Sequence, residues 1–453
     1  MAEIIALRTG GNPLWSHIGD YLRVGETGHH QLETLIEEGR LRTNRAIFDA
    51  NSYRFQKDLA RRLKDSGSEL TLDPKTAELA AAAKCGGRVA QAPWADGLDT
   101  ARRFWERLDV VCRSIAEQAV QEGFHRVISP SHFLQRGAGD PWLEIDVEAF
   151  KRTRQYLDNL GGRDISLDYS LIISRNDLVD EAVRGALLAG IFDLPFENLF
   201  VRISRFGSDA SPAQIRRVIS ALGGFHNLGK GLILDYLGGL TGHAALAFGV
   251  ASGLARGLGE RERFDASDWD KVPRPKSDDD QNGGAAKRVR IFGLDKSLTI
   301  PELNALAKAK NGHRLIVCSD RDCCRRGLEG MVADRKAHYA TQEGKLIHEL
   351  ESVPDQKRVD HFISHELTMA DRTARQIKDL KPVESELQPR KGQTPEQAAQ
   401  KLSHRLAQWA QRNEKTRTVL ENLHHVHEIE RSRMPSVHTH PTIRSTKANR
   451  YEK

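Results

Sequence analysis

Three of the chain's five cysteines fall within seven residues, at Cys318, Cys323 and Cys324. Zinc binds four Cys or His ligands in a tetrahedron, and three thiolates with one imidazole form one of its ordinary structural sets. His338 and His348 follow downstream, and we take His348 as the fourth ligand with His338 as its competitor. The spacing therefore predicts a structural zinc site. The alternative is a turn after a strand that carries small buried thiols.

Acidic side chains mark the ends of several predicted strands. Asp49, Asp73 and Asp235 each end a strand, and Asp168 falls within another. Converging carboxylates can act as nucleophile and as acid or base in a displacement at a sugar carbon. We therefore expect Asp49 and Asp235 to be catalytic, although an aspartate before a helix, such as Asp73, often only caps it. The residues expected to bind substrate are Asp168, Arg202, Arg205, Tyr236, Gly238 and Gly239.

A glycine-rich stretch, Leu237-Gly-Gly-Leu-Thr-Gly-His243, follows one of these strands and opens a helix. Backbone amides at such a helix start can approach an anion closely. Tight turns between strands and helices also use glycine, so the signal is weak alone. The chain has no Walker A, G-x-S-x-G or H-E-x-x-H sequence, which argues against those enzyme classes.

From residue 46 to about 310, short apolar runs alternate with helical patterns. This alternation is typical of βαβ units, and eight strands over about 250 residues predict a (β/α)8 barrel of the TIM type. An open doubly wound sheet is the alternative. The predicted strands are Ala46–Asp49, Glu69–Asp73, His125–Pro130, Ile165–Ile173, Leu199–Ile203, Gly231–Tyr236, Ala251–Gly257 and Arg288–Phe292.

The chain is expected to divide into five parts. The barrel, residues 46–312, carries a long polar loop at 267–287 and is followed by a small zinc-binding and helical appendage. The other parts are an N-terminal extension at 1–45, the Cys/His subdomain at 313–380, a C-terminal helix at 394–430 and a basic disordered tail at 431–453.

The composition indicates the cellular compartment of the protein and the kinds of partner that it could bind. The 453 residues contain no apolar run approaching the roughly 20 that cross a bilayer, and the N-terminus lacks the pattern of a signal peptide. An odd number of bunched cysteines does not fit a secreted disulfide framework, so we expect a cytoplasmic protein with no membrane partner. The net charge of +6 and the basic tail suggest an anionic partner such as nucleic acid. A protein partner or a homo-oligomer remains open.

This layout resembles the tRNA-guanine transglycosylase superfamily, which includes relatives that insert deazaguanines into DNA. Asp49 with Phe55-Gln56 is similar to the family's Asp-Ser-Gly-Gly-Phe-Gln loop, and Gly238-Gly239-Leu240 to its base-binding loop. The three cysteines and His348 are similar to its zinc set. The chain departs from the family at Asn51–Arg54, where two glycines are usual, and in its cysteine spacing. Asp235 matches the second catalytic aspartate only by its place in the barrel.

The resemblance implies a zinc-containing barrel that exchanges a nucleobase in tRNA or DNA. One of the two aspartates would attack the sugar carbon while the other moves protons, and Arg202, Arg205 and the tail would meet phosphates. A second hypothesis is a non-catalytic barrel that binds nucleic acid or serves as a scaffold in a larger assembly. A third is a small-molecule enzyme that binds a phosphate in its glycine loops.

Overall fold

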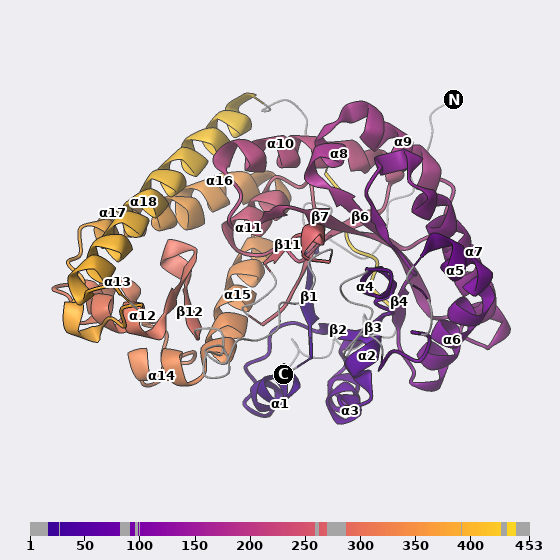
Figure 1. Ribbon diagram of the computed structural model, residues 1–453, viewed down its shortest axis with the longest axis horizontal. Coiled ribbons are helices and arrows are strands. Elements are labelled where there is room, and N and C mark those ends of the chain that lie inside the picture. The colour runs from indigo at the N-terminus through magenta and orange to yellow at the C-terminus, as the bar shows by residue number, and fades with distance from the viewer. Residues whose placement is uncertain are drawn as a thin grey trace.

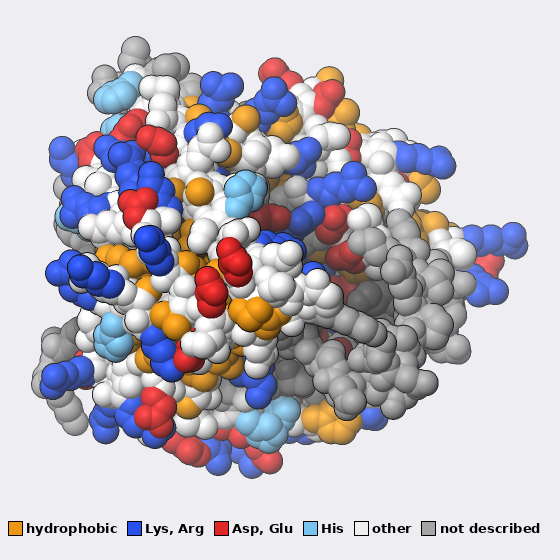
Figure 2. Space-filling model, turned by 60° about the vertical axis from the view of Figure 1, so that its left-hand side comes forward, with side chains coloured by type: hydrophobic (Ala, Val, Ile, Leu, Met, Phe, Trp, Pro, Cys, Tyr) orange, Lys and Arg blue, Asp and Glu red, His pale blue; other side chains and the backbone are white. Residues whose placement is uncertain are grey.

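The computed structural model describes residues 17–26, 28–81, 91–95, 98, 100–258, 262–269, 287–390, 392–426 and 433–440. Figure 1 shows a barrel with surrounding helices on one side of the molecule and a helical appendage on the other. In the described part of the chain, no helix is both long and apolar enough to cross a membrane. Figure 2 shows lysine and arginine side chains interspersed with acidic ones over the appendage side.

Eight parallel strands of the described chain form a closed barrel, which confirms the predicted fold class. The circle closes where β1 pairs with β10 and β6 pairs with β7. Most of these strands are buried along their whole length. The barrel strands are β1 (Gly19–Arg23), β2 (Arg45–Asp49), β3 (Glu69–Asp73), β4 (Arg126–Ile128), β6 (Ser166–Ser174), β7 (Asn198–Ser204), β9 (Gly231–Asp235) and β10 (Gly253–Arg256).

The prediction was wrong about two of the strands. Gly19–Arg23, placed in the N-terminal extension, is the first barrel strand and lies between β10 and β2. Arg288–Ile291 (β12), predicted as the last barrel strand, pairs antiparallel with Lys296–Thr299 (β13) in a separate hairpin. The β propensity of a run of four or five residues does not determine which sheet the run joins. Pairing with strands that are distant in the sequence decides this. Most of the predicted loop at 267–287 lies outside the described residues.

Helices between the strands cover the barrel. Ser211 and Pro212 begin α10 as the sequence indicates, since Ser211 and Gln214 form a reciprocal capping box. The helices of this part are α1 (His29–Glu37), α2 (Ala50–Tyr53), α3 (Lys57–Asp65), α4 (Thr76–Leu79), α5 (Ala101–Glu106), α6 (Leu108–Gln121), α7 (Pro141–Asn159), α8 (Arg175–Val179), α9 (Glu181–Ile191), α10 (Pro212–Leu222) and α11 (Gly239–Ala247).

The appendage has an apolar core of its own, which includes the buried side chains of Leu298, Leu306 and Leu402. The C-terminal helix expected at 394–430 is α18 (Pro395–Val426), which packs along α17. The other helices are α12 (Ile300–Ala307), α13 (Gly312–Ile316), α14 (Leu328–Ala333), α15 (Arg335–Ser352), α16 (Arg358–Phe362), a π-helix (Ile363–Leu367) and α17 (Thr368–Lys378).

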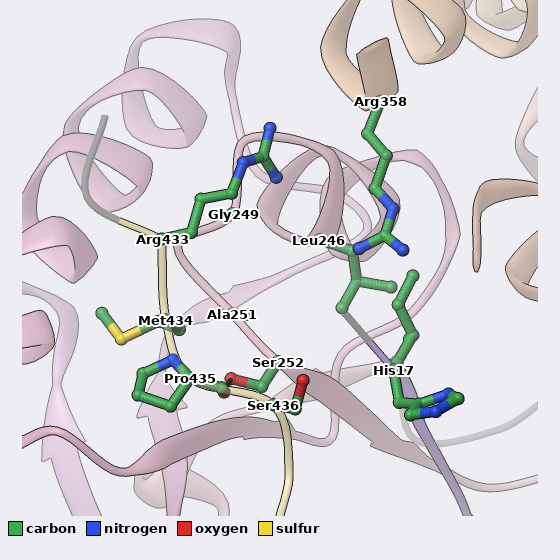
Figure 3. A pocket seen from close by; sticks show the side chains of 11 residues that line it. His17, Leu246, Gly249, Ala251, Ser252, Arg358, Arg433, Met434, Pro435 and Ser436 are labelled. Carbon is green, nitrogen blue, oxygen red and sulfur yellow. Dashed lines mark hydrogen bonds between the residues drawn. The ribbon is translucent and has the colours of Figure 1, made fainter. Parts of the chain in front are cut away.

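Residues 433–440, which we call the C-terminal strap, cross the N-terminal end of the barrel. The expectation of a disordered tail is therefore wrong for these eight residues, and the rest of the tail lies outside the described part. Figure 3 shows the start of the strap beside Ser252, whose hydroxyl donates to the Pro435 carbonyl at 2.6 Å. Further along, the His440 amide donates to Glu69 at 2.8 Å. Val437 is buried in a small cluster at the barrel axis.

Ending the chain at residue 432 is expected to lower the free energy of unfolding by about 3–6 kcal/mol. Val437 and Met434 are both buried, and each such side chain contributes about 1.5–3 kcal/mol. Urea denaturation followed by circular dichroism measures the loss. A chain ending at residue 440 is the matched control and should unfold at the wild-type urea concentration. Equal stability of all three chains would show that the strap does not hold the barrel.

Candidate functional site

The carboxyl ends of the barrel strands bring acids and arginines together. Asp49 and Asp73 are paired in register as the last residues of β2 and β3. On the other side of the barrel, Arg202 of β7 is paired with Asp235, which ends β9. Arg23 ends β1 between them, and all five side chains are buried. The convergence expected for Asp49 and Asp235 is therefore present, together with a cation that the sequence analysis missed.

Arg23 joins the three aspartates. Its Nε and Nη2 donate to the two carboxylate oxygens of Asp235 at 2.6 and 2.7 Å, a bidentate pair. Its Nη1 lies 2.8 Å from Asp73 Oδ2 and 3.3 Å from Asp49 Oδ1. The sequence analysis missed Arg23 because it placed β1 in the N-terminal extension. The short run Asp20-Tyr-Leu-Arg-Val24 between two glycines was the available signal.

Arg202 and Tyr236 complete the centre of the site. Arg202 donates to Asp235 Oδ2 from Nε at 3.0 Å and from Nη2 at 2.8 Å, and its Nη1 lies 3.3 Å from Glu78 Oε1. Tyr236 has a left-handed backbone, with φ of 60°. Its ring centroid lies 4.5 Å from the Arg202 guanidinium carbon and 4.8 Å from that of Arg23. The ring therefore stabilises both buried cations through its π face.

Lys75 and Glu78 extend the site from the loop and helix that follow β3. The Lys75 ammonium contacts Glu78 and lies 3.1 Å from the Tyr236 hydroxyl. The Lys75 amide donates to Asp73 Oδ1 at 2.9 Å, so Asp73 bonds to a backbone amide in the turn before α4. Burial raises the pKa of Asp73, but three neighbouring cations outweigh burial and hold the pKa well below its usual range. Asp73 is therefore an ionised member of the site.

Two residues predicted to bind substrate lie elsewhere. Asp168 is paired with Ile128 in β4, whereas Ile172, four residues further along β6, is level with Arg202. That offset places Asp168 about 13 Å towards the N-terminal end of the barrel, where it receives two hydrogen bonds from Arg126. Arg205 is a surface residue with 68% of its side chain exposed, and its Nε lies 3.6 Å from Asp265. Neither side chain contacts the central carboxylates.

Two amides of the helix start that was predicted to bind an anion, those of Gly239 and Leu240, already have partners from the appendage. The Gly239 amide donates to Glu343 Oε1 at 3.3 Å, and the Leu240 amide donates to Asp295 Oδ1 at 3.1 Å. Gly239 has φ of 60°, and an added Cβ would collide with Asp295. The glycine therefore permits close packing against the appendage, and the Gly239 and Leu240 amides are not free to bind an anion.

The appendage brings Cys318, Cys323, Cys324 and His338 together, with one ligand atom of each within 4.8 Å of the others. The Sγ atoms of Cys323 and Cys324 are 3.6 Å apart, and His338 Nδ1 lies 3.3 and 3.4 Å from them. Tetrahedral zinc with ordinary bond lengths separates two sulfurs by about 3.8 Å, and a sulfur from a nitrogen by about 3.6 Å. These spacings fit a metal ion and are far too long for a disulfide bond.

Neighbouring groups orient this cluster. Asp320 Oδ1 accepts from the Cys323 amide at 3.2 Å, and its carbonyl accepts from the Cys324 amide at 2.7 Å, which holds the two adjacent cysteines in a turn. His338 Nε2 donates to the Arg290 carbonyl at 3.0 Å. That bond leaves the Nδ1 lone pair directed at the thiols, as metal-ligating histidines require.

The choice of His348 as the fourth ligand was wrong. His348 has 57% of its side chain exposed, and its Nδ1 lies 4.0 Å from Glu351. His338 is buried at the cluster instead. Both histidines belong to α15, and their separation of ten residues turns them to different faces of that helix.

No protein-family model matches this sequence, and a search of curated proteins finds no significant match.

Proposed function

We propose that the mouth of the barrel exchanges a nucleobase in a nucleic acid through a covalent bond to Asp49. The observation that carries the proposal is that Asp49 and Asp235 lie on two sides of one guanidinium, buried at the carboxyl ends of the strands. Active sites of barrels of this kind lie at that end. Paired carboxylates suit displacement at a sugar carbon.

We assign the roles of the two aspartates from the way in which Asp235 is held. Asp235 is held by Arg23 and Arg202 through four contacts of 2.6–3.0 Å, which leaves it poorly placed to attack. Asp49 lies 3.3 Å from Arg23. Its oxygen bonds to the sugar carbon as the bond to the outgoing base breaks, and that base takes up a proton from solvent water. The incoming base then displaces Asp49, and Asp235 accepts the proton that it loses.

The partner and the cofactor follow from charge and ligand chemistry. The net charge is +6, and the exposed Arg205 follows the end of β7 at the same mouth, in reach of a phosphate backbone. The appendage cluster is proposed to hold zinc, which favours thiolate and imidazole ligands. Four protein ligands leave no position for a reacting water, so this zinc stabilises the fold and takes no part in the reaction. Thiolates of this kind suit a reducing cytoplasm.

Asp49→Asn is expected to reduce base exchange by at least about 100-fold, because removing the attacking oxygen abolishes the covalent path. The measurement is incorporation of radiolabelled guanine or 7-deazaguanine into tRNA and into double-stranded DNA. Asp58→Asn is the matched control, since Asp58 lies on α3 with 79% of its side chain exposed. Unchanged exchange in Asp49→Asn, or equal losses in both variants, would contradict the assignment.

A second candidate function is supported by two observations. Arg23 already binds all three aspartates, and appendage carboxylates occupy the Gly239 and Leu240 amides. A barrel whose mouth is occupied by ion pairs within the protein suits a scaffold that binds nucleic acid without reacting with it. That function predicts salt-dependent binding with no exchange, unaltered in Asp49→Asn. The small-molecule phosphate hypothesis is less favoured at this loop, since the Gly239 and Leu240 amides are bonded internally.

A further inference from the structure

The end of the C-terminal strap lies among histidines at the N-terminal end of the barrel. His438 and His440 belong to the strap, and His125 directly precedes β4. The rings of His125 and His440 meet edge to face with their centroids 5.1 Å apart. Imidazole is the side chain whose charge ordinarily changes between pH 5 and 8. The strap is therefore docked through groups that acid can alter.

His438 is bound to the barrel through an unprotonated nitrogen. Its Nδ1 lies 3.2 Å from Nη1 of Arg126. An arginine only donates hydrogen bonds and keeps its charge, so the Nδ1 atom of His438 accepts this bond with its lone pair. Arg126 is fully buried, and two hydrogen bonds to Asp168 fix its guanidinium in place. A proton on Nδ1 would replace the bond by two like charges in contact.

One acid faces the other ring nitrogen of His438. Glu197 Oε2 lies 3.5 Å from Nε2 and favours the charged ring. The two side chains are 36% and 40% exposed, so water and salt weaken this attraction. Arg126 is buried instead, where a charge acts more strongly. The buried cation therefore outweighs the exposed acid, and the docked ring of His438 is neutral.

His125 is also neutral beneath the docked strap. Its Nδ1 accepts a hydrogen bond from the Leu70 amide at 3.0 Å, and a proton on that nitrogen would displace the bond. Burial and then the neighbouring ring of His440 lower the pKa of His125 to about 4. The charged groups that face His125 are Glu69, which raises its pKa, and Lys64 and Arg126, which lower it. Docking of the strap and protonation of His125 therefore oppose each other.

We propose that the strap is an acid-sensitive clamp, docked while His125 and His438 are neutral and released when they are protonated. Release exposes the buried side chains of Met434 and Val437 and uncovers the N-terminal end of the barrel. The docked strap binds fewer protons than the released one. Docking is therefore strongest above the ordinary histidine pKa of about 6.5 and weakens as the pH falls below that value. The clamp lies at the opposite end of the barrel from the central carboxylates and does not depend on base exchange.

Hydrogen–deuterium exchange of the full-length, metal-containing protein tests the proposal, with mass spectrometry of a peptide that contains the strap. The His438 and His440 amides donate to Asn198 and Glu69 in the docked strap. Their protection, relative to the unstructured exchange rate at the same pH, therefore reports docking. Each histidine that must stay neutral weakens docking about tenfold between pH 7.5 and 5.5. We expect the protection to fall at least tenfold over this range, and equal protection at both pH values would overturn the proposal.

Asparagine variants test the two histidines, because the amide oxygen of asparagine can accept a bond where Nδ1 does and is not protonated in this range. A double variant, His125→Asn with His438→Asn, should keep the same protection of the strap at pH 7.5 and 5.5. His30→Asn is the matched control, since the side chain of His30 is 75% exposed on α1, and it should lose protection as the wild type does. If the double variant failed to fold, His438→Asn alone should lose about tenfold less protection than the wild type. A loss in His438→Asn or in the folded double variant equal to that of the wild type would refute the clamp.

Discussion

Arg23→Met is expected to lower the free energy of unfolding by about 3–5 kcal/mol, the usual cost of removing one partner from a buried ion pair. Arg23 is the cation shared by three buried carboxylates. Without it, Asp235 keeps Arg202 as a partner, but Asp49 loses the guanidinium contact. Equilibrium denaturation in urea measures the loss, with circular dichroism as the signal.

The matched control is Arg205→Met at the same mouth of the barrel. Because Arg205 is mostly exposed and its ion pair is 3.6 Å long, its loss should change stability by less than about 0.5 kcal/mol. A double variant, Arg23→Met with Asp49→Asn, should recover part of the stability, since it removes the carboxylate that loses its guanidinium contact. If Arg23→Met were as stable as Arg205→Met, the buried network would not contribute to folding.

Replacing Cys323 by serine is expected to abolish metal binding and to lower the temperature at which the appendage unfolds. Structural zinc contributes about 10–16 kcal/mol of binding free energy in small zinc domains, and Cys323 is one of the four residues of the cluster that could hold it. Elemental analysis of the untagged protein should give about one zinc per wild-type chain and almost none in the variant. A chelator should lower the melting temperature of the wild type only.

Histidine variants separate the two candidate ligands. His338→Ala should lose the metal, whereas His348→Ala should retain it, because only His338 directs a nitrogen at the thiols. Cys112→Ser is a further control, since Cys112 is buried in the barrel away from the cluster. Retention of zinc in His338→Ala together with its loss in His348→Ala would contradict the observed arrangement.

Local chemistry in the sequence was enough to predict several features of the structure. The alternation of apolar runs and helical patterns predicted the barrel, because βαβ units must bury both faces of a parallel sheet. Ser211 and Pro212 predicted a helix start through capping, which acts over four residues. Asp49 and Asp235 were recognised as strand-end residues, and the closed barrel brings them together at Arg23. Their catalytic role stays a prediction.

Tertiary structure alone decided the partners of these residues. Arg23 became the centre of the site because β1 closes the barrel, and closure depends on residues more than 200 positions apart. His338 and His348 were indistinguishable by type, and the face of α15 that packs against the hairpin chose between them. The ordered conformation of the strap could not be predicted from its sequence. Its few apolar side chains are buried only because they contact the N-terminal end of the barrel. Local preferences act over a few residues, whereas burial and charge pairing depend on which distant segments meet.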